Sequence, residues 1–172
     1  DVPNSQFTIY NVKGTKNDIH IPAGDYSWTR SIIGFQTASK RKVQLKHEFS
    51  FGDFYNGKRT ENTSFFTFLP SKHFGSILSH SAQDVRLPSG DFKIKLASLT
   101  TRLNFTPDFS WSNLLQYDNI SDNLGFNSRL IWEYRPGKRF FLVLNQSYLD
   151  EYTGFVLKQM DTTIKFSSIF HF

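Results

Sequence analysis

Hydrophobic and polar residues alternate with a period of two along most of the chain. In residues 43–51 the odd positions are mostly apolar, whereas the even positions carry Gln, Lys, Glu and Ser. Residues 109–117, 126–134 and 163–172 repeat this alternation. Successive side chains of a β-strand point to opposite faces of a sheet, so the pattern predicts strands with one apolar face. The 3.6-residue period of a helix is almost absent.

One segment changes phase. Phe92, Ile94 and Leu96 share one parity, but Leu99 and Leu103 have the other. An extra residue in a strand shifts the side chains beyond it to the opposite face. We therefore expect a β-bulge near Ala97 and Ser98.

The predicted connections between strands alternate in length. Short connections are expected at residues 39–41, 70–72, 106–108 and 135–138. The connections at 13–24, 52–62, 83–90 and 147–155 are long, and the one at 118–123 is of medium length. Pro136 and Gly137 suit the second and third positions of a type II turn. All the short connections fall on the side where the chain ends.

These features predict an all-β protein, an antiparallel up-and-down transmembrane β-barrel. About ten strands are expected, the weakest near residues 7–12, and residues 1–172 form one domain, the C-terminal portion of the barrel. Several alternating runs reach nine to twelve residues, close to the roughly 9–11 of a membrane-crossing strand. Bacterial barrels also combine tight periplasmic turns with longer extracellular loops. A soluble β-sandwich shares the two-residue period and remains the alternative fold.

The composition agrees with a barrel. The chain has 19 Phe, 7 Tyr and 3 Trp, yet its mean hydropathy is only −0.41. Strands that place apolar residues toward lipid and polar residues toward a lumen give this combination. No apolar run approaches the roughly 18 residues of a membrane-spanning helix.

Aromatic residues stand at several predicted strand ends, where amphipathic rings form the interfacial girdles of membrane barrels. The predicted girdle residues are Tyr26, Trp28, Phe109, Trp111, Trp132 and Tyr134.

The net charge of +5 is scattered along the chain, and the one basic triplet, Lys40 to Lys42, sits at a predicted turn. We therefore expect no nucleic-acid partner. On the polar face, the predicted lumen-facing charges are Lys46, Glu48, Arg129, Glu133 and Lys165. In a narrow barrel they would pair and plug the lumen; in a wide one they would line a path that favours anions or sugars. The number of strands decides between these outcomes.

No catalytic or metal site is expected. Ser79 and His80, near Asp84, are adjacent on a strand and point to opposite faces, so a dyad would need His47, His73 or His80 across strands. The chain has no Cys, its five His lack zinc-site spacing, and no phosphate-binding glycine loop is present. Asp118 and Asp122, or Asp150 and Glu151, are the alternative as surface calcium ligands. We predict no enzymatic activity and no cofactor.

Several segments resemble the C-terminal barrel of a family of uncharacterised outer-membrane proteins. They are residues 22–28 (PAGDYSW), 52–57 (GDFYNG), 87–92 (LPSGDF), 116–118 (QYD), 127–137 (NSRLIWEYRPG) and 141–145 (FLVLN). Members of that family carry a module similar to carbohydrate-binding family nine before the barrel. This module is missing here, so no sugar-binding residue carries over. Family barrels are also longer than 172 residues.

The resemblance implies a location in the bacterial outer membrane, with outer-membrane lipid and the barrel assembly machinery as partners. Missing N-terminal strands and the carbohydrate-binding-like module would be further partners. Phe166, Phe170 and Phe172 resemble the C-terminal insertion signal that this machinery reads. The expected function is a porin-like membrane anchor or transport component, linked to polysaccharide handling through the absent module. A lipid-acting barrel enzyme and a soluble binding module are the alternatives.

Overall fold

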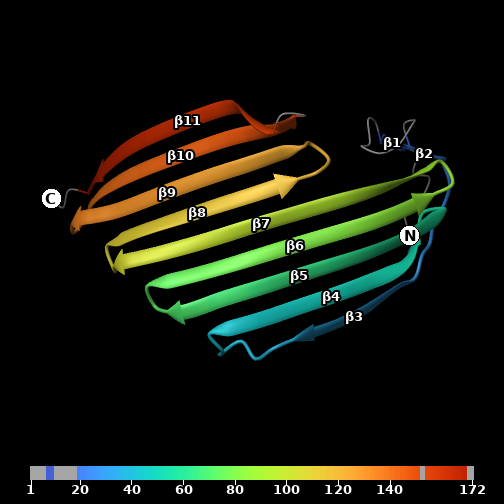
Figure 1. Ribbon diagram of the computed structural model, residues 1–172, viewed down its shortest axis with the longest axis horizontal. Helices are drawn as coiled ribbons and strands as arrows, with labels where there is room; N and C mark the ends of the chain where they lie inside the picture. The colour runs from blue at the N-terminus through green and yellow to red at the C-terminus, as the bar shows by residue number, and fades with distance from the viewer. Residues whose placement is uncertain (1–6, 10–18, 152–153, 170–172) are drawn as a thin grey trace.

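A computed structural model describes residues 7–9, 19–151 and 154–169, and these residues form strands and turns without helices (Figure 1). Nine strands make one antiparallel sheet in which each strand pairs with its neighbour in sequence, in the order β11-β10-β9-β8-β7-β6-β5-β4-β3. The bounds are β3 Arg30–Gln36, β4 Val43–Phe54, β5 Gly57–Ser71, β6 Phe74–Leu87, β7 Gly90–Thr106, β8 Phe109–Asp118, β9 Asn123–Arg135, β10 Lys138–Glu151 and β11 Gly154–Ser168. The prediction of an all-β, antiparallel up-and-down sheet is confirmed.

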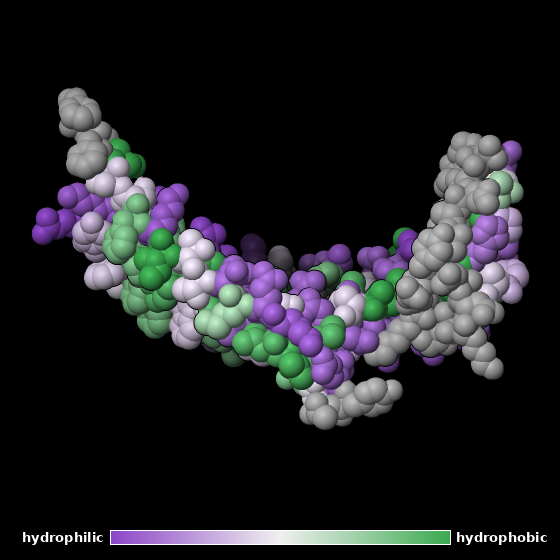
Figure 2. All heavy atoms as spheres, turned by 90° about the horizontal axis from the view of Figure 1, so that it is seen from above, coloured by the Kyte–Doolittle hydropathy of each residue, from purple (hydrophilic) through white to green (hydrophobic). Residues whose placement is uncertain are grey.

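The sheet is curved and open. β3 and β11 are its edges, and neither pairs with the other (Figures 1 and 2). A second, two-stranded sheet pairs β1 (Phe7–Ile9) with β2 (Ile19–Ile21). The strand expected near residues 7–12 is therefore outside the main sheet, which has nine strands among the described residues instead of ten. The described residues contain no second large sheet, as a sandwich would require.

Three of the predicted long connections are wrong. β4 and β5 are joined by Tyr55 and Asn56 alone, and β6 and β7 by Pro88 and Ser89. β10 likewise continues to Glu151 and β11 begins at Gly154. The polar residues that suggested loops continue the strands instead. The backbone N–H and C=O groups of these residues are hydrogen-bonded to the partner strand of the hairpin, so the strand can continue without an apolar face.

Two other sequence expectations also fail locally. β7 pairs with β6 without interruption from Gly90 to Leu103, so there is no bulge at Ala97 and Ser98. The register shift of β7 lies nearer its end, between Asn104 and Thr106. Phe92 lies on the opposite face from Leu99 because it packs against a different partner, β2. Tyr26 and Trp28 also precede β3, which begins at Arg30.

The turn at Pro136 and Gly137 is as predicted. Gly137 has a φ of 74°, the value required at the third position of a type II turn. The sheet has two ends. The N-terminal end (right in Figure 1) carries the turns at 55–56, 88–89 and 119–122, and the C-terminal end carries those at 37–42, 72–73, 107–108 and 136–137.

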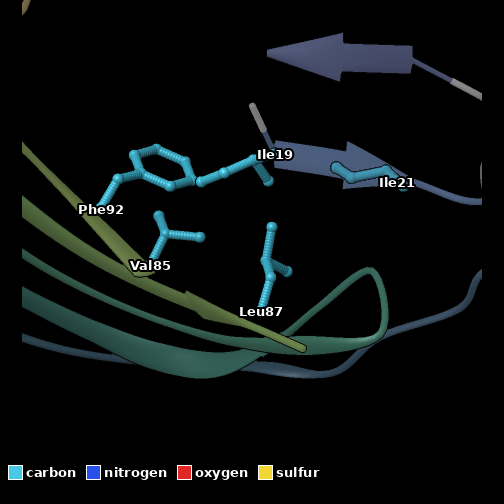
Figure 3. Close-up of a cluster of buried hydrophobic side chains, with 5 residues drawn as sticks. All are labelled: Ile19, Ile21, Val85, Leu87 and Phe92. Carbon is cyan, nitrogen blue, oxygen red and sulfur yellow. The ribbon is translucent and has the colours of Figure 1, made fainter. Parts of the chain in front are cut away.

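The buried apolar core is small and lies at the N-terminal end. Ile19 and Ile21 of β2 pack on Val85, Leu87 and Phe92 of β6 and β7 (Figure 3). These are the buried apolar side chains of the described residues; no layer covers the rest of the sheet. The sheet itself is therefore held together by backbone ladders and cross-strand pairs.

Gly57 allows the β5–β6 contact near this core. A Cβ added to Gly57 would stand 2.0 Å from the carbonyl oxygen of Arg86. We expect Gly57→Ala to lower the free energy of unfolding by about 1–3 kcal/mol, because backbone must move to relieve the overlap. Gly125→Ala is the matched control: its Cβ would meet nothing nearer than the Gln116 carbonyl at 3.9 Å. Equal unfolding free energies of the two variants in denaturant titrations would contradict this explanation.

Candidate functional site: the two faces of the sheet

Register divides the side chains of the sheet into two sets, because directly paired residues share a face. The outer face is the set that contains Phe49 of β4; the inner face is the set that contains Glu48. Hydrophilic side chains gather mainly along the hollowed side of the sheet, and hydrophobic ones mainly along its opposite side (Figure 2).

The outer face exposes large apolar side chains on every strand of the sheet except β10, whose apolar side chains are half-buried. They include Ile33, Phe35, Val43, Leu45, Phe51, Phe66, Phe68, Leu78, Leu99, Trp111, Leu115, Trp132, Phe155, Leu157, Met160, Ile164 and Phe166. Monomeric soluble proteins rarely expose contiguous apolar patches larger than a few hundred Å². A face of this extent requires an apolar environment or a partner.

Aromatic rings border this apolar face at both ends of the sheet. On β10, Phe140 and Tyr148 flank Leu142 and Leu144 on the outer face. The eight residue steps from Phe140 to Tyr148 span about 27 Å along the strand. Strand tilt shortens this span, so it is comparable with the roughly 25 Å apolar band of outer-membrane barrels.

The predicted girdle residues fall into two groups at opposite ends of the sheet. Phe109, Trp132 and Tyr134 lie in ring contact at the C-terminal end, with centroids 6.3 Å apart for Phe109–Trp132 and 5.9 Å for Trp132–Tyr134. Trp111 is nearby and donates from Nε1 to Ser128 Oγ at 2.8 Å. At the N-terminal end, Tyr26 and Trp28 contact the ring of Tyr55 at the β4–β5 turn. Tyr26 and Tyr55 pack against the buried cluster and Trp28 contacts Phe54 of the inner face, so these two rings lie with the inner-face core and do not border the outer face as predicted.

The predicted lumen charges share the inner face. Lys46 and Glu48 are paired with Phe65 and Thr63 on β5. The residues paired with these in turn, strand by strand, identify the inner-face positions of the remaining strands. Arg129, Glu133 and Lys165 lie on that side by register with β10. That the inner face bounds a lumen stays a prediction.

A charged cluster that sequence reasoning missed lies on the inner face at the N-terminal end. Arg30 pairs with Glu61 and donates to Ser50 Oγ, while Arg59 Nη2 lies 3.2 Å from Glu61 Oε2. Gln83 Nε2 also donates to Glu61 Oε1. Sequence reasoning assigned Arg59 and Glu61 to the predicted 52–62 loop. Their two-residue spacing, which puts both side chains on one face of a strand, was therefore not recognised as a sign of this cluster.

Cations predominate on the inner face toward the C-terminal end. Glu133 pairs with Arg139 at 2.6 Å and accepts from the Gly137 N–H at 2.9 Å. Arg102, Arg129 and Lys165 form no ion pair within the described parts of the chain. The local field on this side therefore favours anions.

On β8, β9 and β10 the inner face is rich in amide side chains toward the N-terminal end, where Asp118 is the charged residue beside them. Gly125 opens a hollow of about 310 Å³, with Gln116, Asn123, Asn127 and Asn145 around it. Asn127 donates to Asn145, and Ser147 Oγ donates to Asn123 Oδ1 at 2.8 Å. The inner face thus offers water many hydrogen-bonding groups.

The catalytic candidates remain apart. Ser79 and His80 are on opposite faces, and Ser79 Oγ bonds Ser98 Oγ at 2.7 Å. The structure instead brings His47 Nδ1 to 2.8 Å from Ser64 Oγ on the outer face, with the Phe35 ring beside the imidazole. Among the described residues no carboxylate hydrogen-bonds His47, so the orienting group of a catalytic triad is not in place.

The calcium alternative gains no support. Asp118 accepts from the Ile120 N–H and from Ser121 Oγ, which orders the β8–β9 turn. Glu151 pairs with Lys158 at 2.6 Å. Within residues 7–9, 19–151 and 154–169, no group of three or more His, Cys, Asp or Glu is arranged to hold a metal ion.

Of the insertion-signal residues, Phe166 lies on the outer face of β11, next to Phe140 with ring centroids 5.0 Å apart. Phe170 and Phe172 lie outside the described residues. In the described part of the chain, no helix is long and apolar enough to span a membrane.

The chain matches no protein-family model, no curated protein and no solved structure. The family resemblance therefore stays a prediction.

Proposed function

We propose that the sheet is part of the wall of a bacterial outer-membrane β-barrel, with its outer face in lipid and its inner face toward a polar lumen. The single observation that carries the proposal is the unequal distribution of side chains: most of the exposed large apolar side chains lie on the outer face, whereas the Arg30–Glu61–Arg59 cluster, the Glu133–Arg139 pair and the unpaired cations lie on the inner face. Aromatic rings at both borders of the apolar face support it. The barrel acts as a membrane anchor or as a porin-like transport component.

The inner face favours transport over a plugged anchor. A plug needs charges that pair with one another across a narrow lumen, as in barrels of about eight strands. Within the described residues Arg102, Arg129 and Lys165 form no ion pair, and the nine strands of the sheet do not close. A water-filled path lined by these cations would favour anionic or neutral polar solutes.

Heat-modifiable gel migration tests the membrane proposal. Protein extracted from the outer membrane, or refolded in detergent, should migrate differently unheated and boiled, because a closed barrel resists dodecyl sulfate until heated. It should also precipitate when the detergent is removed. Identical migration, together with solubility in detergent-free buffer, would refute the proposal and favour a soluble binding module.

A further inference from the structure

A hollow lies over β5, β6 and β7 at the C-terminal end of the sheet. Its volume is about 360 Å³, and the residues around it include Leu69, Gly75, Ile77, Thr100 and Arg102. Gly75 is paired with Arg102 on the inner face, so the missing side chain leaves space directly beside the arginine. A Cβ added to Gly75 would stand 2.9 Å from Leu69 Cδ2. Even a methyl group at this position would therefore enter the hollow.

Apolar side chains line the hollow, although the inner face is turned toward water in the proposed barrel. Leu69 is 43% exposed and Ile77 is 41% exposed. Ligand sites in proteins are mostly apolar clefts of roughly 300–1,000 Å³ that carry a few polar groups to fix the orientation of the ligand. An apolar group that covered Leu69 and Ile77 would remove this surface from water, which favours binding.

Two cations border the same hollow. Arg102 and Lys72 line it, and neither forms an ion pair within the described residues. The turn that carries Lys72 is fixed to β7, because Asn104 Nδ2 donates to the Lys72 carbonyl oxygen at 3.3 Å and the Asn104 N–H donates to that of His73 at 2.8 Å. The planar N–H donors of an arginine fit a carboxylate or a phosphate. An anionic group at this border would meet cations that have no charged partner of their own.

We propose that this hollow binds a small organic acid, with its anionic group at Arg102 and Lys72 and its apolar body against Leu69 and Ile77, over Gly75. The proposal rests on the proposed barrel function and names its substrate class. An inorganic anion leaves the apolar lining exposed to water, and a sugar leaves the two cations without a counter-charge. An acid with an apolar body satisfies both parts of the hollow.

Equilibrium dialysis of radiolabelled benzoate against the detergent-refolded protein measures this binding, which should be saturable. Acetate keeps the charge without the ring, and benzyl alcohol keeps the ring without the charge. Each should compete at least about tenfold less well than unlabelled benzoate, because each satisfies only one part of the hollow. If acetate competes as well as benzoate, the apolar lining plays no part and the proposal is wrong.

Arg102→Gln should weaken benzoate binding by about tenfold, the effect of losing one hydrogen-bonded charge pair. Arg129→Gln is the matched control. Arg129 shares an inner-face row with Arg102, to which it is linked by pairing through Ser112, but it does not line the hollow. Its replacement should change the affinity less than about twofold. Equal losses in the two variants would mean that the general field of the inner face attracts the anion, and would overturn the proposed site.

Gly75→Val should fill the hollow and abolish saturable binding. The new side chain meets the end of a flexible leucine, and valine is favourable in a strand, so the sheet can accommodate it. Gly125→Val is its control, because Gly125 opens the separate amide-lined hollow. Ile77→Ser removes part of the apolar lining without filling the space and should weaken binding by roughly fivefold. Unchanged affinity in Ile77→Ser, or in folded Gly75→Val, would contradict the proposal.

Unheated and boiled gel migration of the same preparations reports separately on the barrel. Heat-modifiable protein that does not bind benzoate would overturn the organic-acid site and leave the proposed function standing. Identical migration, with solubility in detergent-free buffer, would overturn the proposed function whatever the result of the dialysis.

Discussion

Leu130→Arg is expected to lower the free energy of unfolding in lipid vesicles by about 1–3 kcal/mol, because Leu130 lies on the lipid face between the midplane, where an arginine costs about 2–4 kcal/mol, and the interface, where it costs about 0–1 kcal/mol. Leu130 lies on the outer face of β9, between Trp111 and Leu142. An arginine there must take its guanidinium out of water or distort the bilayer to reach it. Urea titration of the refolded protein, monitored by tryptophan fluorescence, measures the loss.

Ile131→Arg is the matched control, one residue further along the same strand. Ile131 faces inward, between Glu133 and Arg129 on its own strand, so the new cation meets water, one opposite charge and one like charge. We expect a change below about 1 kcal/mol. If both variants lose the same stability, the outer face is not in lipid and the proposed function is wrong.

Ile21→Asp is expected to detach β2 from the inner face of the sheet while the nine-stranded sheet stays folded. Ile21 is completely buried against the sheet and is one of five residues of a very small core. Truncating a buried Leu or Ile already costs about 2–5 kcal/mol, and an unpaired buried carboxylate adds to this cost. β2 packs on the sheet through this cluster, so a carboxylate in its centre should release the contact.

Hydrogen exchange with mass spectrometry separates detachment from general unfolding. In Ile21→Asp, protection should fall in the β2 peptide and remain in the peptides of β9 and β10. Ile120→Asp, at an exposed turn residue of the same end of the sheet, should leave β2 protected. Loss of protection throughout the sheet would mean that β2 is required for the fold of the wall.

The alternation of side chains was sufficient to predict the central part of most strands, because a one-residue slip would move every side chain to the other face. It also placed Lys46, Glu48, Arg129, Glu133 and Lys165 on one side. Polar stretches such as residues 57–62 were assigned to loops, because loss of apolar alternation was taken as loss of the strand. In a long hairpin the strand continues where neither face is apolar, because its backbone is still hydrogen-bonded to the neighbouring strand.

The packing of β2 on the inner face could not be predicted from the sequence, for a different reason. Phe92 and Val85 are apolar residues on the polar face, and their partners Ile19 and Ile21 lie more than sixty positions away in sequence. Period-two analysis treats such residues as a change of phase. Only the three-dimensional position of β2 explains them as a contact surface.

The order of the sheet, in which every strand pairs with its predecessor, also bears on how the protein folds. Each new pair closes a loop of few residues, so the entropy lost in bringing the strands together is small. Short sequence separations between contacting residues favour rapid folding. The wall can therefore assemble one hairpin at a time, and gain or loss of a whole hairpin would change its circumference without altering any other strand pair.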